Sequence, residues 1–600
     1  MKVLVCVLCF VLLPLGVWGQ SAASGSDDAN SMRQQIEQLK QELAALEKRL
    51  ETQEKRQQQE QAQQQAQQKQ QADQQQQTES STKDLSLKVD ELDSRVSKGE
   101  VRNALDRLNF SGDYRFEAHT IVGHVPAHYD GMTLQNLVVK TMFAMPYIGG
   151  MPTSVDQINN TVANHYADYL QFTNNITFTQ IKQAMASFPP AMQQQLFALL
   201  LPATYVAGYQ ANTPDLLTNR LRLDFNGRVA DNVSYSARLS MYKAFGDSTG
   251  VQIFNGQPNT FNIDGTTAGV PNSDMLRVER AYFSWNHIND SKFYLSIGRR
   301  PSTDGPPMNY RNDELRGGTP SGSLIDFQFD GITLGYNLSE NMTWRLCYGI
   351  GFQSGFGNGN LLVPPQDRLK DTQLIGANLD LWNTEKTLVQ ATYAHAFNVT
   401  DGFNGLVVMP YNPVTGEPTP PVIMRYQPSA NLGSIDLFGM NVEQKAGAFD
   451  FYGSANFSGT HSNGETSPFG GLMCDPFDTC SDHTGYMFLG GVRYRFPNDE
   501  RTKIGFEFNH GSKYWFNFAQ AQDDIIAPKT STRGEVYETY LTHRISERFI
   551  AKVSFIDYNY RYSGSGWHVG APKPLNSTPI LGFPTYDSAW MFTVGMTARF

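Results

Sequence analysis

Residues 300–322, RPSTDGPPMNYRNDELRGGTPSG, gather charges of both signs in a segment rich in Gly and Pro. With the preceding arginine, the charged residues are Arg299, Arg300, Asp304, Arg311, Asp313, Glu314 and Arg316. Arginines that face carboxylates inside an apolar wall produce a transverse electric field, which orients and filters polar molecules. The alternative is a surface loop whose charges only keep it hydrated. The elements that hold the segment decide between the two.

From Asn109 onward, apolar residues recur at every second position, which is typical of strands with two different faces. In FDFYGSANFS, Phe449, Phe451 and Phe457 share one face, and Asp450 and Asn456 share the other. We predict sixteen strands, at 109–120, 217–230, 233–245, 274–288, 292–300, 323–338, 342–352, 371–383, 387–399, 433–445, 449–460, 484–496, 501–512, 532–544, 549–561 and 587–600.

The connections between these strands alternate in length. Tight polar turns such as ADN (230–232), AGA (446–448) and SER (546–548) alternate with long loops that are often rich in Gly or Pro. Short turns on one rim and long loops on the other are typical of an outer-membrane barrel, whose apolar residues face lipid and whose polar residues line a lumen. The predicted fold is therefore an all-β transmembrane antiparallel barrel of about sixteen strands, wide enough for a water-filled channel.

The last strand, WMFTVGMTARF, ends at Phe600. Pairing with the first strand would remove the exposed edge of both, as barrel closure requires. A terminal alternating strand that ends in Phe resembles the targeting signal of bacterial outer-membrane porins. The stretches GDYRFE and GRRPSTDGP are similar to a proteobacterial family of porin-like proteins of unknown function, over about residues 109–600. The resemblance implies an outer-membrane location in a Gram-negative bacterium, and it implies that loop 300–322 folds into the lumen.

A set of arginines occupies the polar faces of the early strands. They are Arg115, Arg222, Arg228, Arg238 and Arg280. In the predicted barrel they form a basic wall opposite loop 300–322, and the alternative is ordinary hydration of the lumen.

The N-terminal residues form two further segments. Residues 1–23, with Lys2 before an apolar core, are typical of a cleaved secretory signal, and a retained anchor is the alternative. Residues 24–108 contain Leu and Ile at spacings of three and four around a Gln-rich tract, which predicts a periplasmic coiled-coil stalk. Such a stalk suggests a homo-oligomer, with a trimer favoured by the porin resemblance; the alternative is a solvated linker.

The long segment 121–216, inserted within the barrel domain 109–600, exceeds an ordinary loop. VDQINNTVANHYADYL and AMQQQLFALLLP predict short helices, which we expect to plug the lumen or cap its mouth. Three histidines, His119, His124 and His128, have a spacing that could suit a metal, but scattered rim residues explain them better.

Cys474 and Cys480 share one predicted outer loop, and a secreted setting allows a disulfide between them. Cys347 would be a lone thiol. No C-x-x-C-H motif is present, and we expect neither a metal nor another cofactor.

The bulk composition agrees with a barrel. The hydrophobic fraction is 40%, the mean hydropathy is −0.40 and the formal net charge is −10, which argues against a helical membrane bundle and against a nucleic-acid partner. The predicted function is an outer-membrane porin for passive diffusion of small polar or anionic solutes. The alternative is a barrel scaffold that sheathes or docks a redox or secretion protein. An enzyme is disfavoured because His510, His543 and His568 are not linked by any local motif to a nucleophile.

Overall fold

The computed structural model describes Glu37 and residues 108–600, apart from 247–268, 270, 272, 356–361, 363, 403–404, 412–417, 427, 521, 577–578 and 583. The predicted signal peptide 1–23 and most of the stalk 24–108 lie outside the described residues. Within the described part, no helix is both long and apolar enough to cross a bilayer.

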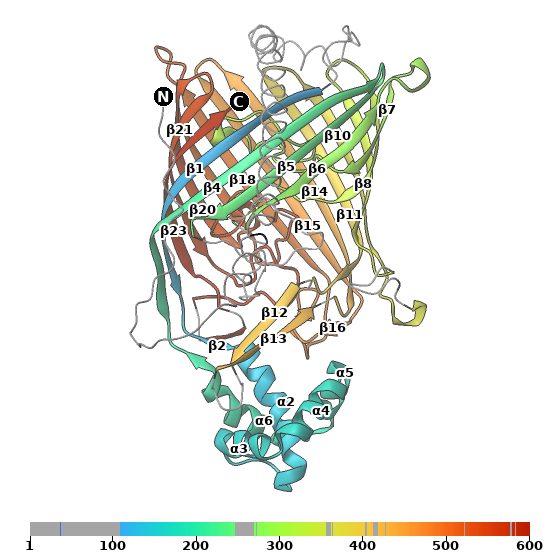
Figure 1. Ribbon diagram of the computed structural model, residues 1–600, viewed down its shortest axis with the longest axis vertical. Coiled ribbons are helices and arrows are strands. Elements are labelled where there is room, and N and C mark those ends of the chain that lie inside the picture. Colours follow the sequence, from blue (N-terminus) through green and yellow to red (C-terminus); the bar gives the residue numbers. More distant parts are fainter. Residues whose placement is uncertain are drawn as a thin grey trace, which may run out of the picture. The chain divides into compact units, whose positions relative to one another are not determined.

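Sixteen antiparallel strands form one closed barrel (Figure 1), so the predicted fold class is confirmed. In chain order they are β1 (Leu108–Val125), β4 (Tyr209–Ala230), β5 (Val233–Ala244), β6 (Ser273–Trp285), β7 (Phe293–Arg299), β8 (Asp330–Asn337), β9 (Thr343–Phe352), β10 (Thr372–Asn383), β11 (Thr387–Thr400), β14 (Asn431–Ala446), β15 (Phe449–Ser462), β18 (His483–Arg495), β19 (Thr502–Gly511), β20 (Gly534–Ser546), β21 (Phe549–Tyr560) and β23 (Ser588–Arg599).

The barrel closes where β1 pairs with both β4 and β23. The backbone N–H of Gly112 donates to the Phe600 carbonyl over 3.1 Å, and the Phe600 N–H donates back over 3.0 Å. A Cβ atom at residue 112 would lie 2.4 Å from the Arg222 carbonyl oxygen and 2.7 Å from the Phe600 ring. Glycine at this position therefore lets the last residue reach the first strand.

The two faces of each strand differ as the alternation predicts. On β15, Phe449, Phe451 and Phe457 are exposed, whereas Asp450 and Asn456 are fully buried on the inner face. Exposed aromatic and aliphatic side chains on the outside of a closed barrel match a lipid environment. The inner face is polar, and its side chains are buried. Other parts of the chain must therefore cover them inside the barrel.

One predicted strand is shorter than expected. The prediction placed residues 323–338 on a strand, but β8 begins only at Asp330. Residues 323–329 instead continue the preceding loop, and Leu324, Ile325, Phe327 and Phe329 are buried there. An alternating apolar segment suits either a strand or a buried loop, so periodicity alone could not separate the two.

The insertion after β1 folds into helices α2 (Gly131–Ile148), α3 (Val155–Asn164), α4 (Tyr166–Asn175), α5 (Phe178–Ser187) and α6 (Pro190–Leu200). The flanking strands extend further than predicted, to Val125 and from Tyr209. Asp130 caps α2 by accepting from the Thr133 N–H, and a capping box starts α5. The helices bury a core of their own that includes Leu134, Ile158 and Leu196.

Short additional strands form small sheets within the segments that connect the barrel strands. β2 (His128–Asp130), β3 (Tyr205–Val206) and β22 (Ile580–Gly582) form a three-stranded sheet, β12 (Gly405–Tyr411) pairs with β13 (Pro418–Tyr426), and β16 (Thr466–Ser467) pairs with β17 (Gly470–Gly471). The helical insertion contacts the β16–β17 loop, because Lys182 Nζ donates to Thr466 Oγ1 over 2.7 Å. It thus meets an outer loop of the barrel, and the loops that fill the lumen come from elsewhere in the chain.

Candidate functional site in the barrel lumen

The segment between β7 and β8, residues 300–329, folds into the lumen and is called the first inner loop below. Near its tip, Arg311 Nη1 lies 2.5 Å from Asp524 Oδ1 and 3.2 Å from Glu538 Oε2, which belongs to β20. β7 and β20 lie on nearly opposite sides of the closed strand order. The first inner loop therefore crosses the lumen and reaches the far wall.

Asp313 anchors the tip of the first inner loop to the same wall. Its carboxylate lies 3.1 Å from Arg493 Nη1 on β18, 2.5 Å from Lys503 Nζ on β19 and 2.8 Å from Arg544 Nη2 on β20. The Arg493 guanidinium also lies over the Tyr310 ring, 4.7 Å from its centroid. Charge-assisted bonds to three adjacent strands hold one aspartate in a defined place.

A second loop, residues 512–533 between β19 and β20, also folds inward and is called the second inner loop. Asp523 accepts hydrogen bonds from Arg115 on β1 and, over 2.9 Å, from Arg220 on β4. Lys529 is fully buried and bonds Glu507 and Glu538. The local sequence of this segment carries no signal that distinguishes it from an ordinary outer loop.

The early-strand arginines gather on one wall. Arg222 pairs with Asp113 at 2.6 Å and with Glu314 at 2.7 Å, and Arg238 pairs with Asp224 at 2.8 Å. We define the arginine cluster as Arg115, Arg220, Arg222, Arg238 and Arg280; Arg220 was not among the predicted site residues. Asp304 lies 3.3 Å from Arg238, and Arg280 donates to the Gly317 carbonyl.

Carboxylates outnumber the arginines of this cluster. They are Asp113, Glu117, Asp224, Glu279, Asp304, Glu314 and Asp523. The expected basic wall is thus a network of ion pairs without net positive charge. The prediction of a basic wall was wrong because it counted the arginines and left out the acids that alternate with them and that arrive on the inner loops.

Two loop carboxylates of this network, Glu314 and Asp523, remain ionised over a wide pH range. Burial raises the pKa of Glu314, but the positive charges of Arg222 and Arg220 outweigh that effect and hold its pKa below the usual value. The pKa of Asp523 is lowered in the same way, against burial, by Arg115 and Arg220. The ion pairs that tie both inner loops to the arginine cluster therefore persist at mildly acidic pH.

The structure gives three further predicted site residues contacts of other kinds. Arg228 bonds Asp231 over 3.0 Å at the turn that ends β4. Arg299 Nε donates to the Val278 carbonyl over 3.1 Å, on the face of β7 that also carries the exposed Phe293. Arg316 lies in the middle of the first inner loop and donates to Asn383 Oδ1 over 3.3 Å. Arg299 was thus misplaced as a lumen residue, whereas Arg228 shares the inner face of β4 with Arg220 and Arg222 but lies at the end of the strand.

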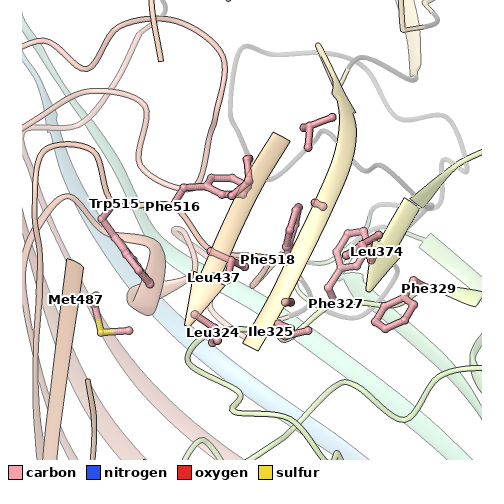
Figure 2. Close-up of a cluster of buried hydrophobic side chains, with 14 of the residues drawn as sticks. Leu324, Ile325, Phe327, Phe329, Leu374, Leu437, Met487, Trp515, Phe516 and Phe518 are labelled. Atoms are coloured by element: carbon pink, nitrogen blue, oxygen red, sulfur yellow. The ribbon is translucent and has the colours of Figure 1, made fainter. Parts of the chain in front are cut away.

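An apolar core joins the two inner loops inside the barrel (Figure 2). Leu324, Ile325, Phe327 and Phe329 of the first loop pack with Trp515, Phe516 and Phe518 of the second and with wall residues Leu374, Leu437 and Met487. The Phe518 N–H donates to the Leu324 carbonyl over 3.1 Å. These contacts fix the two loops to each other and to one side of the lumen wall. The polar pattern of the strands did not indicate an apolar core inside the barrel.

His568, in the loop after β21, packs against this core and leads to a pH prediction. Its Nε2 lies 2.6 Å from the Thr400 carbonyl, and the ring contacts Phe516 edge-on. Burial, with a smaller effect of the nearby Arg533 charge, lowers the pKa of His568 from 6.5 to about 4. Between these values the unfolded chain binds a proton that the folded chain excludes, so stability falls as the pH decreases from 6.5 to 4.

The expected loss over this pH interval is about 3 kcal/mol. The check is the unfolding temperature of the purified barrel at pH 7.5 and pH 4.5, compared with that of the variant His568→Gln. Glutamine can still donate to Thr400 but does not titrate, so the variant should lose this part of the pH dependence. An equal acid shift in both proteins would contradict the assignment to His568.

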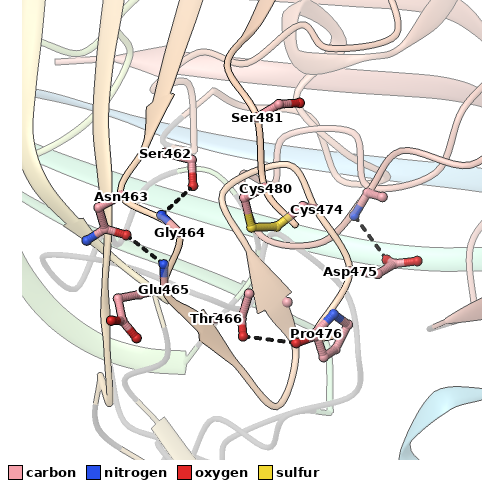
Figure 3. The surroundings of a disulfide bond; sticks show 12 residues. Ser462, Asn463, Gly464, Glu465, Thr466, Cys474, Asp475, Pro476, Cys480 and Ser481 are labelled. Carbon is pink, nitrogen blue, oxygen red and sulfur yellow. Dashed lines mark hydrogen bonds between the residues drawn. A yellow bond between two sulfur atoms is a disulfide. The ribbon is translucent and has the colours of Figure 1, made fainter. Parts of the chain in front are cut away.

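Cys474 and Cys480 form a disulfide within one outer loop, with a Cα–Cα distance of 5.3 Å (Figure 3). A Cβ atom at Gly471 would lie 2.6 Å from Cys480 Sγ, so the loop needs glycine there. The disulfide closes a short loop of the chain, with a sequence separation of 6.

We expect the double variant Cys474→Ser, Cys480→Ser to destabilise this loop by about 2 kcal/mol. Limited proteolysis should then cut the loop faster while the barrel stays intact; cleavage at the wild-type rate would contradict this.

His119 and His124 lie on β1 and bond to protein side chains. His119 bonds Thr593 Oγ1 and Thr218 Oγ1, and His124 lies 2.8 Å from Asp587. In the part of the chain that the structure describes, no group of three or more His, Cys, Asp or Glu side chains is arranged to hold a metal ion.

Comparison with known proteins places the chain in a family. The family DUF3373, described as a protein of unknown function, matches residues 210–600, and the chain belongs to it. No match was found among curated proteins.

Solved structures with a similar fold are outer-membrane proteins. Salmonella typhi OmpF in complex with daunomycin has 9% identity and a TM-score of 0.36, covering 82% of this chain and 97% of its own. The outer membrane channel DcaP of Acinetobacter baumannii has 11% identity and a TM-score of 0.35, with the same coverage. Outer-membrane expressed OmpT of Vibrio cholerae has 10% identity and a TM-score of 0.35, covering 84% and 100%.

Proposed function

We propose that this protein is an outer-membrane channel for small polar solutes, whose flow is limited by the first inner loop. The observation that carries the proposal is the position of that loop: it leaves the wall at Arg300 and is held at the opposite wall through Arg311 and Asp313. A closed barrel with an apolar outside and a charged inside is the architecture of a passive pore. A loop fixed across it by ion pairs narrows the path for solutes.

The test is electrical. The purified full-length protein, added to a planar lipid bilayer, should produce stepwise increases in conductance, and reversal potentials in a salt gradient should give its ion preference. Because the arginine cluster is balanced by carboxylates, we expect only weak selectivity between simple ions. A barrel that inserts but stays silent would contradict the channel, and recovery of a stoichiometric partner protein would then favour a scaffold instead.

We also propose that the barrel lies in the outer membrane of a Gram-negative bacterium after removal of residues 1–23. Residues 24–108 would form a stalk in the periplasm that brings subunits together, with a trimer as the expected state. Cross-linking of the protein with and without residues 24–108 tests the role of the stalk. A trimer that persists without residues 24–108 would mean that the barrel surface, and not the stalk, holds the subunits together.

A further inference from the structure

A cavity of about 200 Å³ lies between the first inner loop and the wall formed by β6 to β11. Its polar lining includes Ser284, Ser296 and Thr333, and its apolar lining includes Ile325, Phe329 and Leu374. Among the described residues that line it, none is an aspartate or a glutamate, whereas two are arginines, Arg300 and Arg345. This lining differs from the arginine cluster, where carboxylates are in excess.

The two arginines of the cavity differ in their partners. Arg345 Nη1 lies 2.8 Å from Asp380 Oδ2 and 2.8 Å from Asn378 Oδ1, and its Nε donates to the Tyr294 hydroxyl. A carboxylate of the wall therefore neutralises Arg345. The cavity receives no net charge from it.

Arg300 has no such partner. Its side chain is 8% exposed, its Nη1 donates to Ser296 Oγ over 3.0 Å, and its guanidinium lies over the Tyr282 ring at 5.5 Å. Within the described part of the chain, no carboxylate lies at ion-pair distance from it. A buried guanidinium without a counter-charge is unfavourable, because desolvation is not offset by an ion pair. An anion in the adjoining cavity would offset it.

We propose that Arg300 and this cavity bind the carboxylate of a small organic monoanion as it passes through the lumen. This inference rests on the proposed channel function and names a solute class for it. One uncompensated positive charge matches one carboxylate, which a guanidinium binds through two parallel hydrogen bonds. The Ser296 hydroxyl accepts from Arg300 and keeps its own proton to donate. Ile325, Phe329 and Leu374 then contact an apolar body.

The charge of the bound molecule distinguishes a monoanion from a dianion and from a neutral molecule. A phosphate dianion would bring a second negative charge into a cavity that offers only one free guanidinium. A neutral molecule of the same shape would leave Arg300 unpaired. The cavity should therefore prefer benzoate to both inorganic phosphate and benzamide.

The experiment is isothermal titration calorimetry of the full-length protein in detergent with benzoate, benzamide and inorganic phosphate. We expect saturable binding of benzoate alone, and a loss of affinity of roughly tenfold or more in Arg300→Met, because the charge-assisted bonds disappear. The matched control is Arg501→Met, since Arg501 is an exposed arginine in the turn before β19 that pairs with Asp499. It should bind benzoate as the wild type does.

Each result decides the proposal. Equal binding of benzoate and benzamide, or of benzoate and phosphate, by the wild type would overturn it, and this comparison does not depend on whether any variant folds. Unchanged benzoate affinity in a folded Arg300→Met would overturn it as well. A protein that conducts ions but does not bind benzoate refutes this inference alone, whereas one that binds benzoate but stays silent in bilayers refutes the channel.

Discussion

Replacing Arg311 by methionine should lower the free energy of unfolding of the barrel by about 3–5 kcal/mol. Arg311 is 5% exposed and pairs with Asp524 and Glu538. Glu538 keeps Lys529 as a partner, but Asp524 would lose its only ion pair with a side chain among the described residues. The cost arises from a carboxylate that remains buried without a counter-charge. The measurement is the urea concentration at which the folded barrel, followed by its mobility on an unheated gel, disappears.

Two further variants separate charge from packing in this experiment. Arg501→Met removes an arginine that is exposed and pairs with Asp499, so its effect should stay below about 1 kcal/mol. The double variant Arg311→Met, Asp524→Asn removes both charges of the buried pair and should recover part of the loss. The comparison also needs the single variant Asp524→Asn. If the double variant lost as much stability as Arg311→Met and Asp524→Asn lose together, the two residues would not be coupled and the proposed anchoring would fail.

Replacing Phe518 by alanine should lower the free energy of unfolding by about 3–5 kcal/mol, although the residue lies inside the barrel. Its ring is 2% exposed and lies 5.1 Å from Phe516 and 5.9 Å from Phe327, measured between ring centroids. Truncation removes apolar contacts between the two inner loops and leaves a cavity that the anchored chain cannot close. We expect the loosened loops to raise the single-channel conductance as well.

The matched control for Phe518 is Phe506→Ala on the outer face of β19, where the side chain is 45% exposed. Both variants delete the same atoms, but only the first disrupts packing inside the lumen. Phe506→Ala should therefore leave conductance unchanged and cost less stability in detergent. A lumen that is wet around Phe518 would instead give equal and small effects for both variants.

The barrel could be predicted from the sequence because its causes are local. Alternating residues such as Phe449, Asp450 and Phe451 define two faces within one strand, and turns such as Gly447 with its φ of 59° end the strands. The strand number and order follow from these signals in sequence. The stretch 323–329 is the exception, since its apolar residues cover the other inner loop and not lipid.

The sequence by itself determined the strands and their lipid-facing side, whereas the inward fold of the loop between β7 and β8 was implied only by the resemblance to porins. Only the tertiary structure decided which charges meet: Arg311 and Asp524 are 213 residues apart, and Arg115 and Asp523 are 408 apart. Their pairing depends on barrel closure and on two loops that enter the same lumen. No local pattern encodes such distances. For the same reason, only the folded chain distinguishes Arg300 from the arginines that are paired, because the described residues lining its cavity include no acid.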